Sequence, residues 1–174
     1  MRITILTLFP EMFNGFKENS IIKRAIAKGV VTVDFVNIRD FTLDKYGRVD
    51  SAPVGGGAGL IMKCQPIIDA INSVKTPDSK VYLLSPRGEQ YSQAKAHYFA
   101  RKCEHLILLC GHYEGVDERV GKYIDGQISI GDYILTGGEI AAMIVADSII
   151  RLIPGVIVEE SHLVDSFNDQ LLDY

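Results

Sequence analysis

Short, uninterrupted apolar runs alternate along the chain with segments of helical spacing, and this alternation limits the possible folds more than any other feature. Five runs have the length and composition of buried strands: residues 3–8, 31–37, 81–84, 106–110 and 127–130. Helical spacing and end signals predict helices over residues 20–28, 66–74, 93–102, 117–123 and 140–153. Continuous apolar strands are typical of parallel sheets buried on both sides. We therefore predict an α/β fold, a parallel sheet with helices on both faces.

Composition fits one globular domain, since 47% of the 174 residues are hydrophobic. The longest apolar stretch, residues 140–153, is too short and too polar to cross a bilayer, so no membrane partner is expected. The N-terminal apolar run lacks the features of an export signal, which makes the cytoplasm the expected location. Residues 156–174 contain five acidic residues and no Lys or Arg, a composition typical of a linker.

Charge is divided unevenly along the sequence. Residues 1–102 contain 15 Lys and Arg against 9 Asp and Glu, whereas residues 103–174 contain 3 against 13. A basic first half is compatible with a polyanionic partner such as a nucleic acid. Composition alone favours the simpler interpretation, an ordinary solvated surface.

Glycine- and proline-rich segments follow three consecutive predicted strands, over residues 85–88, 111–115 and 131–139. Ligands of α/β proteins bind beyond the carboxyl ends of the strands, and glycine lets the backbone approach them closely. Turns in α/β proteins also need Gly and Pro for purely structural reasons. Three such segments in a row, each with polar side chains, nevertheless favour a ligand site at this edge.

Common nucleotide, metal and hydrolase motifs are not matched. The glycine-rich run Gly55–Gly59, within a predicted loop over residues 42–59, lacks the last glycine of a dinucleotide-binding fingerprint, and no P-loop occurs. Cys103, His105, Cys110 and His112 match no zinc spacing, and the G-x-S-x-G pattern of a nucleophile elbow is missing.

Eight stretches carry a resemblance that extends over nearly the whole chain. They are residues 8–13 (LFPEMF), 39–42 (RDFT), 55–59 (GGGAG), 84–86 (LSP), 110–119 (CGHYEGVDER), 129–139 (SIGDYILTGGE), 153–156 (IPGV) and 165–167 (DSF). Through them the chain resembles the bacterial tRNA (guanine-N1)-methyltransferases, members of the SPOUT class of knotted methyltransferases.

The resemblance implies a deep trefoil knot that binds S-adenosylmethionine, and methylation of N1 of guanosine 37 in tRNA, next to the anticodon. By match, the knot loops are residues 84–88, 111–115 and 130–138. The residues expected to bind the cofactor are Leu84, Ser85, Pro86, Gly88, Gly111, Tyr113, Glu114, Ser129, Ile130, Gly131, Asp132, Tyr133, Ile134, Leu135, Gly137 and Gly138.

Two residues acquire catalytic roles from the resemblance. On residue type alone, Arg151 would only favour the negative end of its helix, and Asp165 would be a solvated charge. By match, Asp165 is the general base and Arg151 the catalytic arginine. The family is a homodimer whose sites use both subunits, and it has been linked to magnesium, for which Glu114 is the nearest acidic residue. No metal-ligand set is predicted.

The resemblance also predicts the domain organisation. Residues 1–157 are expected to form the cofactor-binding catalytic domain and residues 158–174 the acidic interdomain linker, with the family's C-terminal domain absent from this chain. One alternative is a dimeric module that binds S-adenosylmethionine without catalysis in this truncated form. Another is an unrelated flavodoxin-like domain that binds flavin.

Overall fold

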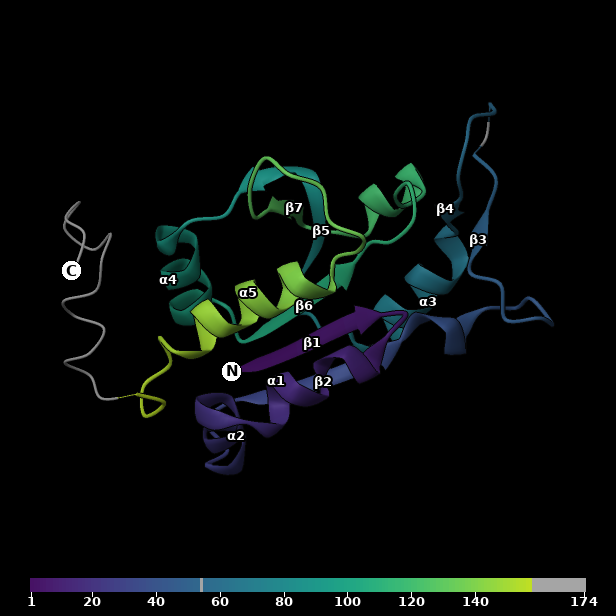
Figure 1. Ribbon diagram of the computed structural model, residues 1–174. Coiled ribbons are helices and arrows are strands. Elements are labelled where there is room, and N and C mark those ends of the chain that lie inside the picture. The colour runs from purple at the N-terminus through teal and green to yellow at the C-terminus, as the bar shows by residue number, and fades with distance from the viewer. Residues whose placement is uncertain (54, 158–174) are drawn as a thin grey trace.

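Five parallel strands form the central sheet, in the order β2-β1-β6-β5-β7 (Figure 1). The computed structural model describes residues 1–53 and 55–157. The strands are β1 (Arg2–Thr7), β2 (Thr32–Asn37), β5 (Ser79–Gln90), β6 (His105–Cys110) and β7 (Gly126–Ser129). The predicted parallel α/β sheet is confirmed.

Two hydrophobic clusters cover the two faces of this sheet, which explains the uninterrupted apolar runs. On β6, Leu106 and Leu108 belong to one cluster, whereas Ile107 and Leu109 belong to the other. All four side chains are fully buried. A strand buried on both faces places its side chains in apolar surroundings on either side, and its sequence therefore does not alternate.

Helices complete both layers. The first cluster includes side chains of α2 (Ser20–Ala27), α4 (Gln93–Lys102) and α5 (Glu139–Ile150), and the second those of α3 (Cys64–Val74). No helix within residues 1–53 and 55–157 is long and apolar enough to cross a membrane.

The first half of the chain contains elements that the sequence did not predict. Residues 10–18 form a 3-10 helix, η1 (Pro10–Phe13), followed by α1 (Asn14–Glu18), and η2 (Ile38–Phe41) follows β2. The prediction of an unstructured loop over residues 42–59 is wrong in part. A two-stranded antiparallel hairpin forms from β3 (Asp50–Ser51) and β4 (Ile61–Met62), because a short backbone pairing needs no apolar run.

Boundaries differ most around β5 and α5. The strand predicted over residues 81–84 continues to Gln90. Its pairing with β7 shifts in register between Leu84 and Glu89, since both residues pair with Ile128. Residues 85–88 therefore leave the pairing register, as expected for a strand-end loop, although they lie within the span of β5. The helix predicted over residues 140–153 ends at Ile150, and turns follow before Pro154. The helix predicted over residues 117–123 is the 3-10 helix η3 (Glu118–Lys122).

Candidate functional site

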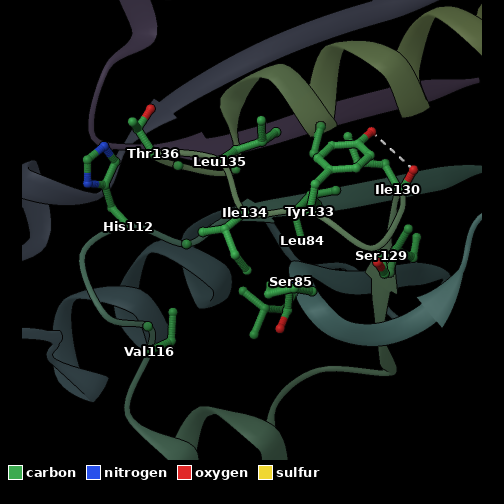
Figure 2. A pocket seen from close by; sticks show the side chains of 18 of the residues that line it. Leu84, Ser85, His112, Val116, Ser129, Ile130, Tyr133, Ile134, Leu135 and Thr136 are labelled. Carbon is green, nitrogen blue, oxygen red and sulfur yellow. Dashed lines mark hydrogen bonds between the residues drawn. The ribbon is translucent and has the colours of Figure 1, made fainter.

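A pocket of about 370 Å³ opens at the carboxyl ends of β5, β6 and β7 (Figure 2). Its walls come from the three segments singled out in the sequence. Of the residues predicted to hold the cofactor, all but Gly88 and Asp132 line it. The pocket also includes residues that were not among the predicted cofactor-binding residues: Leu83, His112, Gly115, Val116, Ile128, Thr136 and Ala141.

The first wall is the bulge in β5. Arg87 donates its backbone N–H to Ser85 Oγ at 3.2 Å, which closes a tight turn. Gly88 lies against the backbone of β7, where an added Cβ would come within 2.5 Å of Gln127 C and 2.6 Å of Ile128 C. Gly88 therefore lets β5 cross β7 closely. Its role in the observed fold is this close approach, and it does not line the pocket.

The second wall follows β6 and turns sharply. Tyr113 has a φ of 59° and Gly115 a φ of 135°, both in the left-handed region. The His112 ring lies 5.1 Å from the ring of Phe9 and 5.2 Å from that of Tyr113. His112 Nδ1 is buried and has no hydrogen-bond partner within the described residues. Such a buried nitrogen without a hydrogen-bond partner is an exception in folded proteins.

The third wall is the segment between β7 and α5. Tyr133 folds back over Gly131 and donates its hydroxyl to the Ile130 carbonyl at 3.2 Å, drawn as a dashed line in Figure 2. An added Cβ on Gly131 would lie 2.5 Å from the Tyr133 ring, so the tyrosine needs glycine beneath it. Ile134, at the tip of this segment, is 81% exposed. The segment forms an apolar rim of the pocket.

The second and third walls are held together by backbone contacts. Gly138 N donates to Gly111 O at 2.8 Å, and His112 and Gly137 form an isolated antiparallel bridge. An added Cβ on Gly138 would lie 2.8 Å from Cys110 Cα and 3.0 Å from Gly111 N. Gly138 therefore allows α5 to begin directly against the end of β6. These contacts make the pocket a preformed cradle of backbone polar groups and apolar side chains.

The hairpin that contains the glycine-rich run Gly55–Gly59 contacts the second wall of the pocket. Glu114 N donates to Leu60 O at 3.0 Å, Met62 N to Gly115 O at 2.9 Å, and Asp117 N to Met62 O at 3.0 Å. These three bonds connect the hairpin of β3 and β4 to the second wall.

The Arg119 guanidinium beside Asp117 lowers the pKa of that carboxyl, which also accepts the Arg119 N–H at the start of η3.

Of the two predicted catalytic residues, Arg151 is described by the structure and does not line this pocket. Arg151 is the half-buried C-cap residue of α5, whereas the pocket lies at the opposite, N-terminal end of the helix. Asp165 lies outside the described residues. The predicted linker, residues 158–174, also lies outside them.

Acidic groups are sparse around the pocket. Glu114 is exposed and, among the residues that the structure describes, is the only acidic one that lines the pocket. Within residues 1–53 and 55–157, no group of three or more His, Cys, Asp and Glu side chains is placed to hold a metal ion.

Sequence reasoning missed pocket residues for two identifiable reasons. Leu83, Ile128 and Ala141 belong to a strand or helix, and only their place near its end brings them to the pocket. His112, Val116 and Thr136 lie inside or beside the segments already singled out. Taking each segment as a whole would have found this second group.

Comparisons with known proteins give one consistent result. The family model described as "tRNA (Guanine-1)-methyltransferase TrmD" matches residues 1–174. A tRNA (guanine-N(1)-)-methyltransferase of Malacoplasma penetrans is 58% identical over 174 residues, covering 100% of this chain and 76% of the relative. The corresponding protein of Carboxydothermus hydrogenoformans is 53% identical over 176 residues, covering 100% of this chain and 69% of the relative.

A solved structure agrees. The crystal structure of a tRNA (m1G37) methyltransferase from Aquifex aeolicus superposes with a TM-score of 0.82 at 40% identity. It covers 91% of this chain, which in turn covers 72% of that structure's chain. The three-segment pocket, the parallel sheet and the full-length match lead to the same conclusion: the chain belongs to the TrmD family of tRNA (guanine-1)-methyltransferases.

Proposed function

We propose that this protein transfers a methyl group from S-adenosylmethionine to N1 of guanosine 37 in tRNA. The observation that carries the proposal is the match to the family over residues 1–174. Three of the stretches that carry the resemblance, residues 84–86, 110–119 and 129–139, supply residues that line one pocket. A tRNA-modifying enzyme works where tRNA is made and used, which supports a cytoplasmic location.

The pocket fits the proposed cofactor in size and character. Its volume of about 370 Å³ lies in the range of small-molecule sites. Gly111 lines it, and an added Cβ there would make ordinary van der Waals contacts with Val116, Leu84 and Leu83 at 3.5–3.7 Å. Bound in this pocket, S-adenosylmethionine supplies an electrophilic methyl group on a positively charged sulfur. The residues we assign to it are those already described as lining the pocket, together with Gly88 and Asp132 as close neighbours.

We also infer that the three walls belong to a knotted backbone. Their mutual contacts support this inference. The segment before α5 packs against the end of β6 through Gly138, while the bulge of β5 passes close to β7 at Gly88.

The chemistry requires a base and a cation. N1 of guanine carries a proton, so a carboxylate must remove it as the methyl group is transferred. We assign this role to Asp165. Loss of the proton places negative charge on O6, which a guanidinium stabilises, and we assign that role to Arg151.

The position of Arg151 supports a dimer with shared sites. Arg151 follows a helix of 12 residues that begins at the pocket, so it lies about 18 Å along the axis from the pocket of its own chain. A second copy must therefore provide this side chain if it is to act on the bound guanine. Ile140 and Ile144 on α5 are 48% and 44% exposed, which supplies apolar surface for such a contact.

Two measurements test the proposal. Calorimetric titration with S-adenosylhomocysteine should give binding, and no heat of binding would contradict the assigned pocket. Single-turnover methylation of a tRNA transcript with guanosine 37 should give product, and a transcript with adenosine 37 should give none. Binding without methylation would instead favour a module that binds S-adenosylmethionine without catalysis.

A further inference from the structure

Glu139 is the one buried acidic residue within residues 1–53 and 55–157. It is the first residue of α5, its side chain is 2% exposed, and the proposed chemistry assigns it no role. The cost of burying a carboxylate makes such a residue unusual unless a cation or several donors compensate it.

Within the described residues, the Glu139 carboxylate accepts one side-chain hydrogen bond. Thr7 Oγ1 donates to Glu139 Oε1 at 2.8 Å, and the Phe9 N–H in turn donates to Thr7 Oγ1 at 2.9 Å. The ion pairs of the described chain involve other residues, and none includes Glu139. Thr7 is thus the one side-chain donor to Glu139 among the described residues, and the N-terminus of α5, where Glu139 is the first residue, also favours its negative charge.

The other carboxylate oxygen lies directly behind the pocket wall. An added Cβ on Gly137 would overlap Glu139 Oε2. Gly137, Gly138 and Ala141 line the pocket, so the thickness of a single backbone segment separates the charge from the space that a ligand would fill. Burial, with a further contribution from Glu139, raises the pKa of the Cys110 thiol well above its usual range, as expected beside a buried negative charge.

We propose that Glu139 determines specificity at this pocket by favouring a positively charged ligand over a neutral one of the same shape. The inference rests on the proposed function. In that reaction the ligand enters as a sulfonium cation and leaves as a neutral thioether. A carboxylate in a poorly solvated wall interacts with a nearby cation much more strongly than it would in water. Glu139 therefore strengthens binding of the methyl donor without retaining the product.

The test compares affinities for the two charge states in the intact chain. Calorimetry gives Kd for S-adenosylmethionine and for S-adenosylhomocysteine in the wild type and in Glu139→Gln, which keeps the shape and can still accept from Thr7. We expect S-adenosylmethionine affinity to fall roughly tenfold and S-adenosylhomocysteine affinity to change less than about twofold. If Glu139 had only a structural role, the substitution would weaken the binding of both ligands equally.

Two further variants separate charge from architecture. Thr7→Val removes the hydrogen bond but keeps the charge, so the ratio of the two affinities should stay near that of the wild type. Glu104→Gln removes an exposed carboxylate beside the start of β6, at the opposite end of the sheet, and should change neither affinity.

Each outcome decides between the two proposals. A folded Glu139→Gln chain whose affinity ratio equals that of the wild type would overturn this inference alone. A wild-type chain that binds neither ligand would overturn the proposed function. If Glu139→Gln does not fold, the double variant Thr7→Val/Glu139→Met replaces both partners by apolar groups of similar shape, and the same ratio is measured.

Discussion

Glu139 and Arg151 lie at opposite ends of one helix, Glu139 as the first residue of α5 and Arg151 as its C-cap. A rigid helix keeps these two side chains apart whatever ligand binds. Because the pocket lies at the N-terminal end of α5, a small rearrangement cannot bring Arg151 of the same chain to it.

Mixed dimers test this relationship directly. Gly111→Leu should block the pocket, and Arg151→Ala should remove the guanidinium, so each variant alone should be inactive. Equal amounts refolded together should recover about a quarter of wild-type methylation, because half of the dimers are mixed and each contains one complete site. A mixture as inactive as its components would show that Arg151 acts in its own chain or not at all.

Gly138 and Gly111 form a matched pair for testing the packing of the pocket walls. Gly138→Ala would place Cβ 2.8 Å from Cys110 Cα, a backbone atom that cannot move aside, whereas Cβ at Gly111 makes only ordinary contacts. We expect Gly138→Ala to lower the free energy of unfolding by about 1–3 kcal/mol and to weaken S-adenosylhomocysteine binding. Gly111→Ala should unfold at nearly the wild-type urea concentration. Equal stabilities would contradict the close contact at Gly138.

The hairpin contacts predict a second difference between glycines. Gly59 has a φ of 86°, and its Cβ would lie 2.9 Å from Glu114 Cδ, whereas Gly55 has a φ of 101° and nothing within 4 Å. Both alanine variants carry similar backbone strain, but only the Cβ of Gly59→Ala pushes against the Glu114 side chain of the second wall. Calorimetry should show S-adenosylhomocysteine affinity lowered at least about fivefold in Gly59→Ala and little changed in Gly55→Ala. Similar affinities would mean that the hairpin and the pocket are uncoupled.

His105 makes the free energy of unfolding depend on pH. It is buried between Thr4 Oγ1, 2.9 Å from Nε2, and Ser79 Oγ, 2.7 Å from Nδ1, and burial lowers its pKa below the usual 6.5. Between the folded-state pKa and pH 6.5, the unfolded chain therefore binds a proton at His105 that the folded chain does not bind. The resulting stabilisation is present above pH 6.5 and is lost as pH falls through the folded-state pKa.

Urea unfolding between pH 8 and pH 5 checks this expectation. His105→Gln should cost about 1–3 kcal/mol at pH 8, because two buried hydroxyls lose their partner. Its stability should then fall less steeply below pH 6.5 than that of the wild type. Identical slopes would show that His105 does not titrate on unfolding.

The strands that the sequence predicted best are those buried on both faces. In β6, every residue from Leu106 to Leu109 faces a hydrophobic cluster, so local composition and tertiary environment agree. The 12-residue β5 was predicted only over residues 81–84, because its second half continues beyond a bulge whose register depends on Ile128 of β7. Pairing between distant segments is not visible in local composition.

The candidate site was predictable only to the level of segments. Glycines such as Gly88 and Gly138 marked the walls because backbone contacts leave no room for side chains there. The position of Glu139 behind Gly137 could not be predicted, since it depends on a hydrogen bond to Thr7, 132 residues earlier. The distance of Arg151 from the pocket likewise follows from the direction of α5, which a motif match does not contain.

The sheet order has a consequence for synthesis on the ribosome. β1 pairs with β2 about 30 residues later, but its other edge waits for β6, where Arg2 pairs with His105. At 5–20 residues per second, that edge stays unpaired for roughly 5–20 s while the intervening chain is made. Since long-range parallel pairing is also slow, the nascent chain exposes an apolar strand edge for longer than most of its own secondary structure takes to form. During translation, chaperones should therefore bind the nascent chain mainly at β1, before the residues that form the pocket have been made.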